Sequence, residues 1–245
     1  MQFSAEQQEI WATLYQRQLE RVQRYACHEY LQGFERLNLP SDHIPSLGSL
    51  NRKIHPATGW KTVRTAVRYT EAVPWYQAFS RREFLVTDYM RGRHELDFTP
   101  EPDMFHDIFG HLPFMILPQY TQLQELFAPA FAQASPDQRE VIKRLAWYGT
   151  EFGLIRENGD LKILGAGLMS SSGEMEHVMS GRVLIVPFSV DHVEGHAKAI
   201  WNYNEMLFVV DSLEALKVEL HDYFKAIGRP RESEPVSELM PGPGG

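Results

Sequence analysis

The segment from Thr99 to Pro113 constrains the fold of this chain most, because it places two histidines, His106 and His111, five residues apart. On a straight α-helix, at about 100° per residue, these side chains would point roughly 140° apart. They can share one site only if the helix widens or ends between them. Gly110 and Pro113 favour an end, since Gly permits left-handed backbone and Pro cannot continue a helix.

A third candidate ligand, Glu151, lies in an otherwise apolar run. A buried carboxylate is costly unless it is paired, hydrogen-bonded or bound to a cation. Two imidazoles and one carboxylate can hold one face of a divalent metal, as in non-heme iron(II) oxygenases. The five-residue spacing argues against a zinc protease, whose histidines are four apart. On these residues alone, an exposed glutamate and histidines of the core or surface remain open alternatives.

Three motifs follow one another along the chain: Pro-Glu-Pro-Asp-x-x-His-Asp-x-x-Gly-His-x-Pro, Trp-Tyr-x-x-Glu-Phe-Gly-Leu and Gly-Ala-Gly-Leu-Met-Ser-Ser. Their order and spacing resemble the tetrahydropterin-dependent aromatic amino acid hydroxylases, in particular the short bacterial phenylalanine 4-hydroxylases. Matching stretches run from near Ile10 to Ser212. The resemblance implies a mainly α fold with short β-strands, in a single catalytic domain of the aromatic amino acid hydroxylase type.

The activity that the resemblance implies is hydroxylation of an aromatic amino acid ring, with phenylalanine converted to tyrosine. Its cofactors would be Fe(II), held by His106, His111 and Glu151, and a tetrahydropterin that supplies two electrons, with O2 as co-substrate. One alternative is hydroxylation of tryptophan, or of phenylalanine at another ring position, because a methylene-sized change in a pocket shifts preference. An alternative of another class is a metal-binding protein that kept the fold without turnover.

The substrate site is also implied by the resemblance. Arg91 matches the arginine that binds the substrate carboxylate, and a guanidinium can grip a carboxylate with two parallel hydrogen bonds. Without the resemblance, Arg91 would be interpreted as a solvated surface charge and the aromatic residues as core. Asp103 and Asp107 are also candidates to orient a ligand histidine. The other residues assigned to the substrate site are Thr99, Asp103, Trp147, Phe152 and Ser170.

The pterin site departs from the family pattern. In the family, the loop after Gly-Trp-Lys carries a Gly-Leu pair whose backbone lies against the pterin, whereas residues 64–71 of this chain contain no glycine. Trp75 supplies an aromatic ring at the expected stacking position. We therefore predict that Trp75 contacts the pterin. Gly165-Ala166-Gly167 lacks the third glycine of a dinucleotide-binding loop, which argues against a dehydrogenase.

Composition excludes several classes of protein. The net charge of −8 and the pI near 5.7 argue against a nucleic-acid or anionic-membrane partner, which would need a basic face. Cys27 is the only cysteine, so an intramolecular disulfide and a cysteine-rich zinc site are both excluded. No apolar stretch approaches the roughly 18 residues of a membrane span, and the N-terminus does not resemble a signal peptide. We expect a cytoplasmic monomer whose partner is a small aromatic amino acid.

Local patterns predict the remaining organisation. Ser4 with Gln7 forms a capping box before one long helix or two. Residues 40–59 are expected to form an ordered loop, and the region from 72 to 89 mixes helix and strand signals. We expect strands at 59–63, 161–164, 182–187 and 207–210. We also expect a short helix started by Pro100 and Pro102, a helix from Ser135 through Glu151 to Asn158-Gly159, and a last helix over 213–226 capped by Ser212. The catalytic domain is expected to span 1–228, followed by a disordered tail over 229–245.

Overall fold

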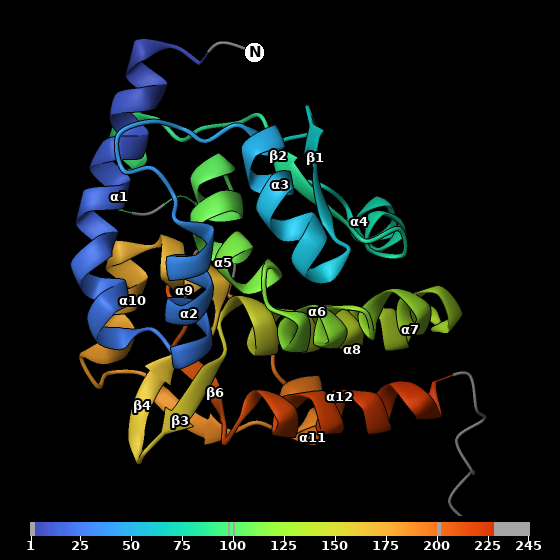
Figure 1. The fold of residues 1–245 in the computed structure, drawn as a ribbon. Helices are drawn as coiled ribbons and strands as arrows, with labels where there is room; N and C mark the ends of the chain where they lie inside the picture. Colours follow the sequence, from blue (N-terminus) through green and yellow to red (C-terminus); the bar gives the residue numbers. More distant parts are fainter. Residues whose placement is uncertain (1–2, 98, 100, 200–201, 228–245) are drawn as a thin grey trace, which may run out of the picture.

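The computed structural model describes residues 3–97, 99, 101–199 and 202–227 (Figure 1). It is mainly helical with short strands, as the sequence predicted. No helix among the described residues is both long enough and apolar enough to cross a membrane. The predicted tail, at 229–245, lies outside the described residues.

The N-terminal apolar pattern forms two helices. Helix α1 (Ala5–Tyr25) begins at the predicted capping box with Ser4. The chain then becomes extended at Ala26, which forms a β-bridge with Ile163, and α2 (His28–Leu37) follows. A contact with a distant strand therefore divides a pattern that could have continued as one helix.

The predicted proline-containing loop is largely a helix, α3 (Leu47–Thr58), so this prediction was wrong. Ser46 caps its start by accepting a hydrogen bond from a backbone N–H. Leu50 and Ile54, four residues apart, are buried on its inner face. Pro56 lies in the last turn, where the lost N–H removes only one intrahelical bond.

The region after α3 forms a small parallel sheet. Strand β1 (Lys61–Thr65) lies two residues beyond the predicted start and pairs in parallel with β2 (Glu83–Thr87). Helix α4 (Ala72–Phe79) connects them, as a crossover between parallel strands requires. The mixed signals from 72 to 89 therefore reflect a helix followed by a strand.

The central part of the chain is helical and contains both candidate metal-ligand segments. Its elements are the 3-10 helix η1 (Arg93–Glu95), the π-helix η2 (His106–His111), α5 (Leu112–Met115), α6 (Pro118–Gln124), α7 (Phe127–Gln133), α8 (Pro136–Ala146) and the π-helix η3 (Trp147–Glu151). Helix α8 begins at the predicted capping box with Ser135.

The helix that contains Glu151 does not continue to Asn158-Gly159 as predicted. It ends at Phe152, and Asn158 and Gly159, with φ of 53° and 89°, form the turn of a hairpin. An Asn-Gly pair is a strong signal for a two-residue hairpin turn, so its assignment as a helix stop was wrong. The glutamate therefore lies at the end of its helix, facing the interior.

The C-terminal part contributes a four-stranded sheet with order β4-β3-β6-β5. Its strands are β3 (Leu154–Glu157), β4 (Asp160–Ile163), β5 (Leu184–Pro187) and β6 (Met206–Val210). The helices of this part are α9 (Ala166–Ser170), α10 (Ser172–Met179), α11 (Val190–Glu194) and α12 (Leu213–Ala226). The predicted last helix and its Ser212 cap are confirmed.

The helices surround the two π-helices. On one side α1 packs against α9 and α10, and on the other α8 packs against α7 and α11. Helix α12 lies below α7 and α8 in Figure 1 and contacts α11. Helix α9 contacts both η2 and η3. The ligand segments therefore meet in the interior, where a core of aromatic and aliphatic residues fixes their positions.

Candidate metal centre

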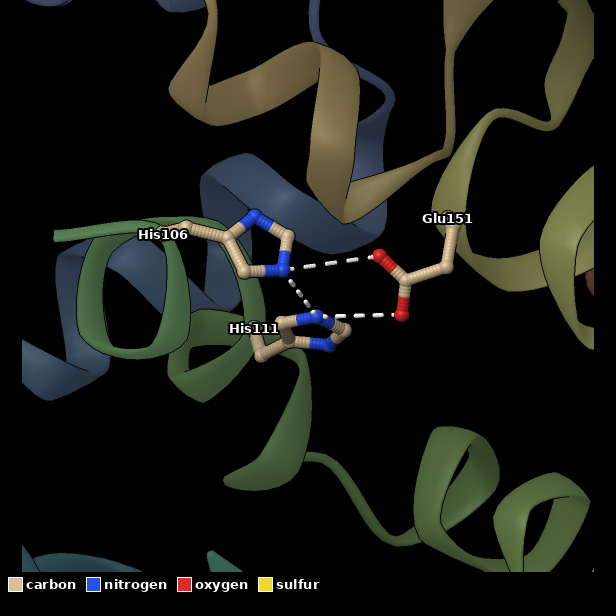
Figure 2. A group of neighbouring side chains, drawn as sticks. All are labelled: His106, His111 and Glu151. Carbon is tan, nitrogen blue, oxygen red and sulfur yellow. Dashed lines mark hydrogen bonds and ion pairs between the residues drawn. The ribbon is translucent and has the colours of Figure 1, made fainter. Parts of the chain in front are cut away.

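His106, His111 and Glu151 come together at one point, as Figure 2 shows. Nε2 of His111 lies 3.1 Å from Oε1 of Glu151, and Nε2 of His106 lies 3.6 Å from Oε2. The two Nε2 atoms are 3.1 Å apart. One nitrogen or oxygen from each of the three residues lies within 4.8 Å of the others, a spacing at which a single metal ion can be held.

Widening of the helix, rather than its end, brings the two histidines together. Both belong to η2, and the wider π-turn places residues five apart on one face. The helix then continues through Pro113 into α5, so the predicted end at Gly110 was wrong. A Cβ on Gly110 would lie 2.5 Å from the carbonyl oxygen of Ala166, so glycine is needed here for close packing of α9.

A second π-helix, η3, places Glu151 at its last position. The N–H of Phe152 donates to the carbonyl oxygen of Trp147 across five residues. A Cβ on Gly165 would lie 2.2 Å from the carbonyl oxygen of Glu151. The glycines around Ala166 therefore allow α9 to pack tightly on both ligand segments.

The charges of the three groups depend on one another. Burial, and then the proximity of His111, lower the pKa of His106 to about 4. Burial opposes the charged form of His111, but the Glu151 carboxylate outweighs it and raises the pKa of His111. Burial would also raise the pKa of Glu151, yet His111 outweighs it and lowers that pKa. His106 and Glu151 are thus held in the forms that bind metals, neutral imidazole and carboxylate, whereas the raised pKa of His111 favours its protonated form, so metal binding has to displace a proton there.

Ser170 contacts His106 from the side away from Glu151. Its Oγ lies 2.9 Å from Nδ1 of His106 and donates a hydrogen bond to the carbonyl oxygen of Gly167. Because the hydroxyl hydrogen is used, the network assigns the proton of His106 to Nδ1, which donates to Ser170. Nε2 then presents its lone pair to the site. The sequence predicted Ser170 as a substrate residue and missed this contact.

Arg91 is buried, with 2% of its side chain exposed, and is not a solvated surface charge. Its Nε and Nη2 donate to the two carboxylate oxygens of Asp103 at 2.8 and 2.9 Å. Asp103 also accepts from the backbone N–H of His106 at 3.0 Å. Despite its burial, the pKa of Asp103 is lowered by the Arg91 guanidinium. The pair therefore positions a guanidinium directly behind a metal-ligand segment.

Asp107 links η2 to the small sheet. Its Oδ2 accepts a hydrogen bond from the backbone N–H of Thr87 at 2.8 Å, and burial raises its pKa to about 7. The sequence suggested that Asp107 orients a ligand histidine; its hydrogen bond is with the end of β2, and its charge also acts on His111, whose pKa it helps to raise.

An aromatic pocket opens beside His111 and Glu151. It has an empty volume of about 340 Å³, including its open mouth. The ring of Trp75 packs against Phe79 and Phe84 with centroids 5.0 and 5.3 Å apart. The lining residues are Trp75, Tyr76, Phe79, Phe84, His111, Met115, Gln124, Phe127, Ala146, Thr150 and Glu151.

The predicted residues thus fall into two groups. Arg91, Asp103 and Ser170 lie around His106, whereas Trp75 lines the pocket beside His111. Other predicted residues lie outside the pocket lining: the rings of Trp147 and Phe152 pack together at 4.5 Å, and Thr99 donates to the carbonyl oxygen of Glu101. The sequence missed Tyr76, Phe79, Phe84 and Gln124 as pocket residues. The high aromatic content of residues 75–84 was the available signal.

Comparison with known proteins gives a consistent result. Residues 1–234 match the family described as biopterin-dependent aromatic amino acid hydroxylase. The phenylalanine-4-hydroxylase of Chromobacterium violaceum is 36% identical over 216 residues, which cover 87% of this chain and 72% of that protein. The phenylalanine-4-hydroxylase of Pseudomonas aeruginosa is 34% identical over 184 residues, 74% of this chain and 69% of that protein.

Solved structures agree with the sequence matches. The crystal structure of the Chromobacterium violaceum phenylalanine hydroxylase with bound iron(III) and the oxidised cofactor 7,8-dihydrobiopterin superposes with a TM-score of 0.86 at 34% identity. The match covers 91% of this chain and 82% of that one. From motifs, fold and relatives together, this chain belongs to the biopterin-dependent aromatic amino acid hydroxylase family.

Proposed function

We propose that this protein is an iron(II)- and tetrahydropterin-dependent monooxygenase that converts phenylalanine to tyrosine. The observation that carries the proposal is the convergence of two imidazole nitrogens and one carboxylate within 4.8 Å, beside an aromatic pocket. This donor set suits iron(II) and leaves metal positions open for other ligands. Relatives that are named phenylalanine-4-hydroxylase support the choice of substrate.

The chain's own residues would bind and orient the reactants. His106, His111 and Glu151 would hold iron, and Ser170 would keep Nε2 of His106 directed at it. Iron and a reduced pterin together supply the oxygen activation and the electrons that no side chain provides. The neutral state of His106, enforced by burial and by His111, means that metal need not displace a proton from this ligand near neutral pH.

The substrate and cofactor would occupy different sides of the centre. Arg91, held by Asp103, would bind the substrate carboxylate, with Thr99 and Ser170 assisting. Trp147 and Phe152 would contact the substrate ring. Trp75 would stack on the pterin, because it faces the pocket that also exposes His111 and Glu151.

Other aspects of the proposal rest on the sequence. We infer that the protein is cytoplasmic and monomeric, and that it binds small molecules and no nucleic acid. Light scattering after size-exclusion chromatography tests the oligomeric state, because a monomer has a mass of 28.3 kDa. Hydroxylation of tryptophan, or of phenylalanine at another ring position, is the alternative within enzymes. A non-catalytic metal-binding protein is the alternative outside them.

The deciding experiment supplies iron(II), tetrahydrobiopterin and each of phenylalanine, tyrosine and tryptophan, and identifies products by mass spectrometry. Chromatography against the three tyrosine ring isomers then gives the position of hydroxylation. We expect para-tyrosine from phenylalanine, and none from a His106→Ala variant. Oxygen consumption that no aromatic amino acid stimulates would support the non-catalytic alternative instead.

A further inference from the structure

Two polar side chains line the aromatic pocket without a protein partner. Gln124, the last residue of α6, is 6% exposed, and Tyr76 of α4 is 7% exposed. Both belong to the pocket lining. Neither side chain forms a hydrogen bond of regular geometry with any residue that the structure describes. Unpaired polar groups in the interior cost free energy, so such groups usually bind a ligand, a water molecule or another part of the protein.

The Gln124 amide faces the pocket. The hydroxyl of Tyr120, four residues earlier in α6, lies close to it: burial raises the pKa of Tyr120, and Gln124 partly opposes that rise. The hydroxyl oxygen of Tyr120 is fully buried, whereas the amide oxygen and nitrogen of Gln124 are not. An amide has two N–H donors and two acceptor positions, of which one hydroxyl can satisfy only one. Gln124 therefore directs most of its hydrogen-bonding capacity into the pocket.

Neighbouring polar side chains differ from Gln124, because the protein itself supplies their partners. The Thr150 hydroxyl, also in the pocket lining, donates to the carbonyl oxygen of Ala146 at 2.9 Å. The Thr121 hydroxyl, buried on the same helix as Gln124, donates to the carbonyl oxygen of Pro118 at 3.1 Å. The Gln124 amide thus remains available to a ligand.

The walls around this amide suit a flat ring. Trp75, Phe79 and Phe84 line the pocket and pack against one another. Aromatic faces favour stacking with a planar ligand. An amide forms two parallel hydrogen bonds with a ring edge that carries a donor next to an acceptor, as glutamine does with adenine. The pocket therefore fits a planar heteroaromatic ligand with such an edge.

The two organic ligands of the proposed reaction differ in this respect. The ring of phenylalanine has no hydrogen-bonding group and would leave the Gln124 amide unpaired, which opposes its binding here. The pyrimidinone ring of a pterin carries N3–H beside the C4 carbonyl, and an amino group beside N1. Each of these edges is complementary to an amide.

We infer that Gln124 binds the pyrimidinone edge of the pterin through paired hydrogen bonds, with the Tyr76 hydroxyl as a further partner, and that this contact selects the pterin over phenylalanine in the pocket. This inference rests on the proposed function. It adds polar recognition of the ring edge to the stacking that we expect of Trp75.

Gln124→Met tests the contact, because methionine removes the amide and keeps a long unbranched side chain. In isothermal titration calorimetry of the iron-loaded full chain, 7,8-dihydrobiopterin should bind at least about tenfold more weakly, and phenylalanine should stay within about twofold. Tyr76→Phe should weaken 7,8-dihydrobiopterin by about threefold or more. Gln122→Met is the matched control: Gln122 is exposed on α6, accepts from Lys217 at 3.2 Å, and should change neither affinity.

The melting temperature without pterin separates binding from support of the fold. Replacement of an unpaired buried amide by an apolar side chain removes a desolvation cost from the free protein. We therefore expect Gln124→Met to melt at the same temperature as the unaltered protein or higher, although it binds the pterin more weakly.

A pterin methylated at N3 identifies the edge that Gln124 binds, because the methyl group removes the N3–H donor and leaves the amino edge intact. If methylation weakens binding to the unaltered protein much more than binding to Gln124→Met, the contact is with N3–H and the C4 carbonyl. Equal weakening in both proteins assigns the contact to the amino group and N1.

Two outcomes overturn the inference and leave the proposed function standing. Unchanged affinity of Gln124→Met for 7,8-dihydrobiopterin removes the contact. A lower melting temperature with proportional loss of both ligands assigns Gln124 to the structure. Absence of 7,8-dihydrobiopterin binding by the unaltered protein overturns the inference together with the pterin dependence of the proposed function.

Discussion

Each histidine of the metal centre is held by a different contact. His106 is bound by Ser170 through Nδ1 and by Asp103 through its backbone N–H. His111 instead packs against the ring of Phe84, with centroids 5.0 Å apart, and faces Glu151. Orientation of His106 therefore depends on Ser170 and Asp103, whereas that of His111 depends on packing against Phe84 and on the Glu151 carboxylate.

Arg91→Lys keeps the charge but loses the planar guanidinium, whose Nε and Nη2 bind Asp103 and whose remaining N–H groups would bind the substrate carboxylate. We expect the Michaelis constant for phenylalanine to rise by about tenfold or more while iron content stays normal. Steady-state kinetics and metal analysis check this. Arg93→Lys, whose side chain is 52% exposed, is the matched control and should behave as the unaltered protein. An unchanged Michaelis constant in Arg91→Lys would remove Arg91 from the substrate site.

Trp75→Ala removes the stacking face from the pocket. Aromatic stacking contributes roughly 0.5–1.5 kcal/mol beyond area burial, so we expect pterin affinity to fall about tenfold with phenylalanine binding less affected. Calorimetric titration of both ligands checks this, and Trp75→Phe should restore most of the affinity. Proportional loss of both affinities together with a lower melting temperature would mean that Trp75 only supports the core.

At the level of elements, two π-helices rather than regular helices present the ligands. Helix η2 aligns residues five apart, and η3 ends the helix at the residue that supplies the carboxylate. Such wide turns are rare and less favourable than α-helix, so tertiary packing has to maintain them. Helix α9 does this, since it contacts both elements.

Gly110→Ala tests that packing. The added Cβ would lie 2.5 Å from the Ala166 carbonyl oxygen, so η2 and α9 have to separate. We expect the variant to lose about 1–3 kcal/mol of unfolding free energy and to bind iron less tightly, measured by urea denaturation and metal titration. Gly195→Ala, where nothing lies within 4 Å of the new Cβ, should change neither. Normal stability and iron binding in Gly110→Ala would contradict this account of η2.

Glu174, in α10, should make the stability of the folded protein depend on pH. It is buried, its Oε1 accepts from Nδ2 of Asn204 at 2.7 Å, and burial raises its pKa from 4.5 to about 7. Between these values the folded state retains a proton that the unfolded state releases. The free energy of unfolding that this retained proton contributes is complete below pH 4.5 and is lost as the pH rises to about 7.

Glu174→Gln should abolish this dependence, because the amide is neutral at every pH and its oxygen can still accept from Asn204. Relative to the unaltered protein, the variant should gain about 3 kcal/mol of unfolding free energy between pH 4.5 and 7. Urea denaturation at several pH values measures the difference. Parallel curves for the two proteins would show that Glu174 does not titrate with folding.

At the scale of the whole molecule, the metal site joins elements that are distant in the sequence. His106 and His111 lie among the N-terminal helices and the small sheet, and Glu151 leads directly into the four-stranded sheet. A metal bound by the folded state alone therefore stabilises both parts together.

Iron(II) should raise the melting temperature of the whole chain under anaerobic conditions, and a chelator should reverse the rise. At a concentration about 100 times the dissociation constant, binding contributes about 2.7 kcal/mol, or roughly 5–10 °C for a chain of this size. His106→Ala and His111→Ala should lose the shift, while His43→Ala, whose side chain is 58% exposed, should keep it. A full shift in either metal-site variant would disprove the ligand assignment.

Much of this protein was predictable from local sequence. The capping boxes at Ser4 and Ser135, the Ser212 cap and the strand near 207–210 all depend on residues a few positions apart. Local hydrogen bonds and apolar periodicity determine such features, and both can be identified in a short window. The three motifs likewise indicated the ligand set, because motif spacing is a property of the sequence.

Only the tertiary structure decided how those ligands meet. The sequence allowed the helix at His106 to widen or to end, and packing of α9 against Gly110 selects widening. Ser170 contacts His106 across 64 positions, and the buried pairing of Arg91 with Asp103 depends on the fold that encloses both. Such contacts are set by the packing of distant segments, which contributes more energy than the local preferences that a sequence reveals.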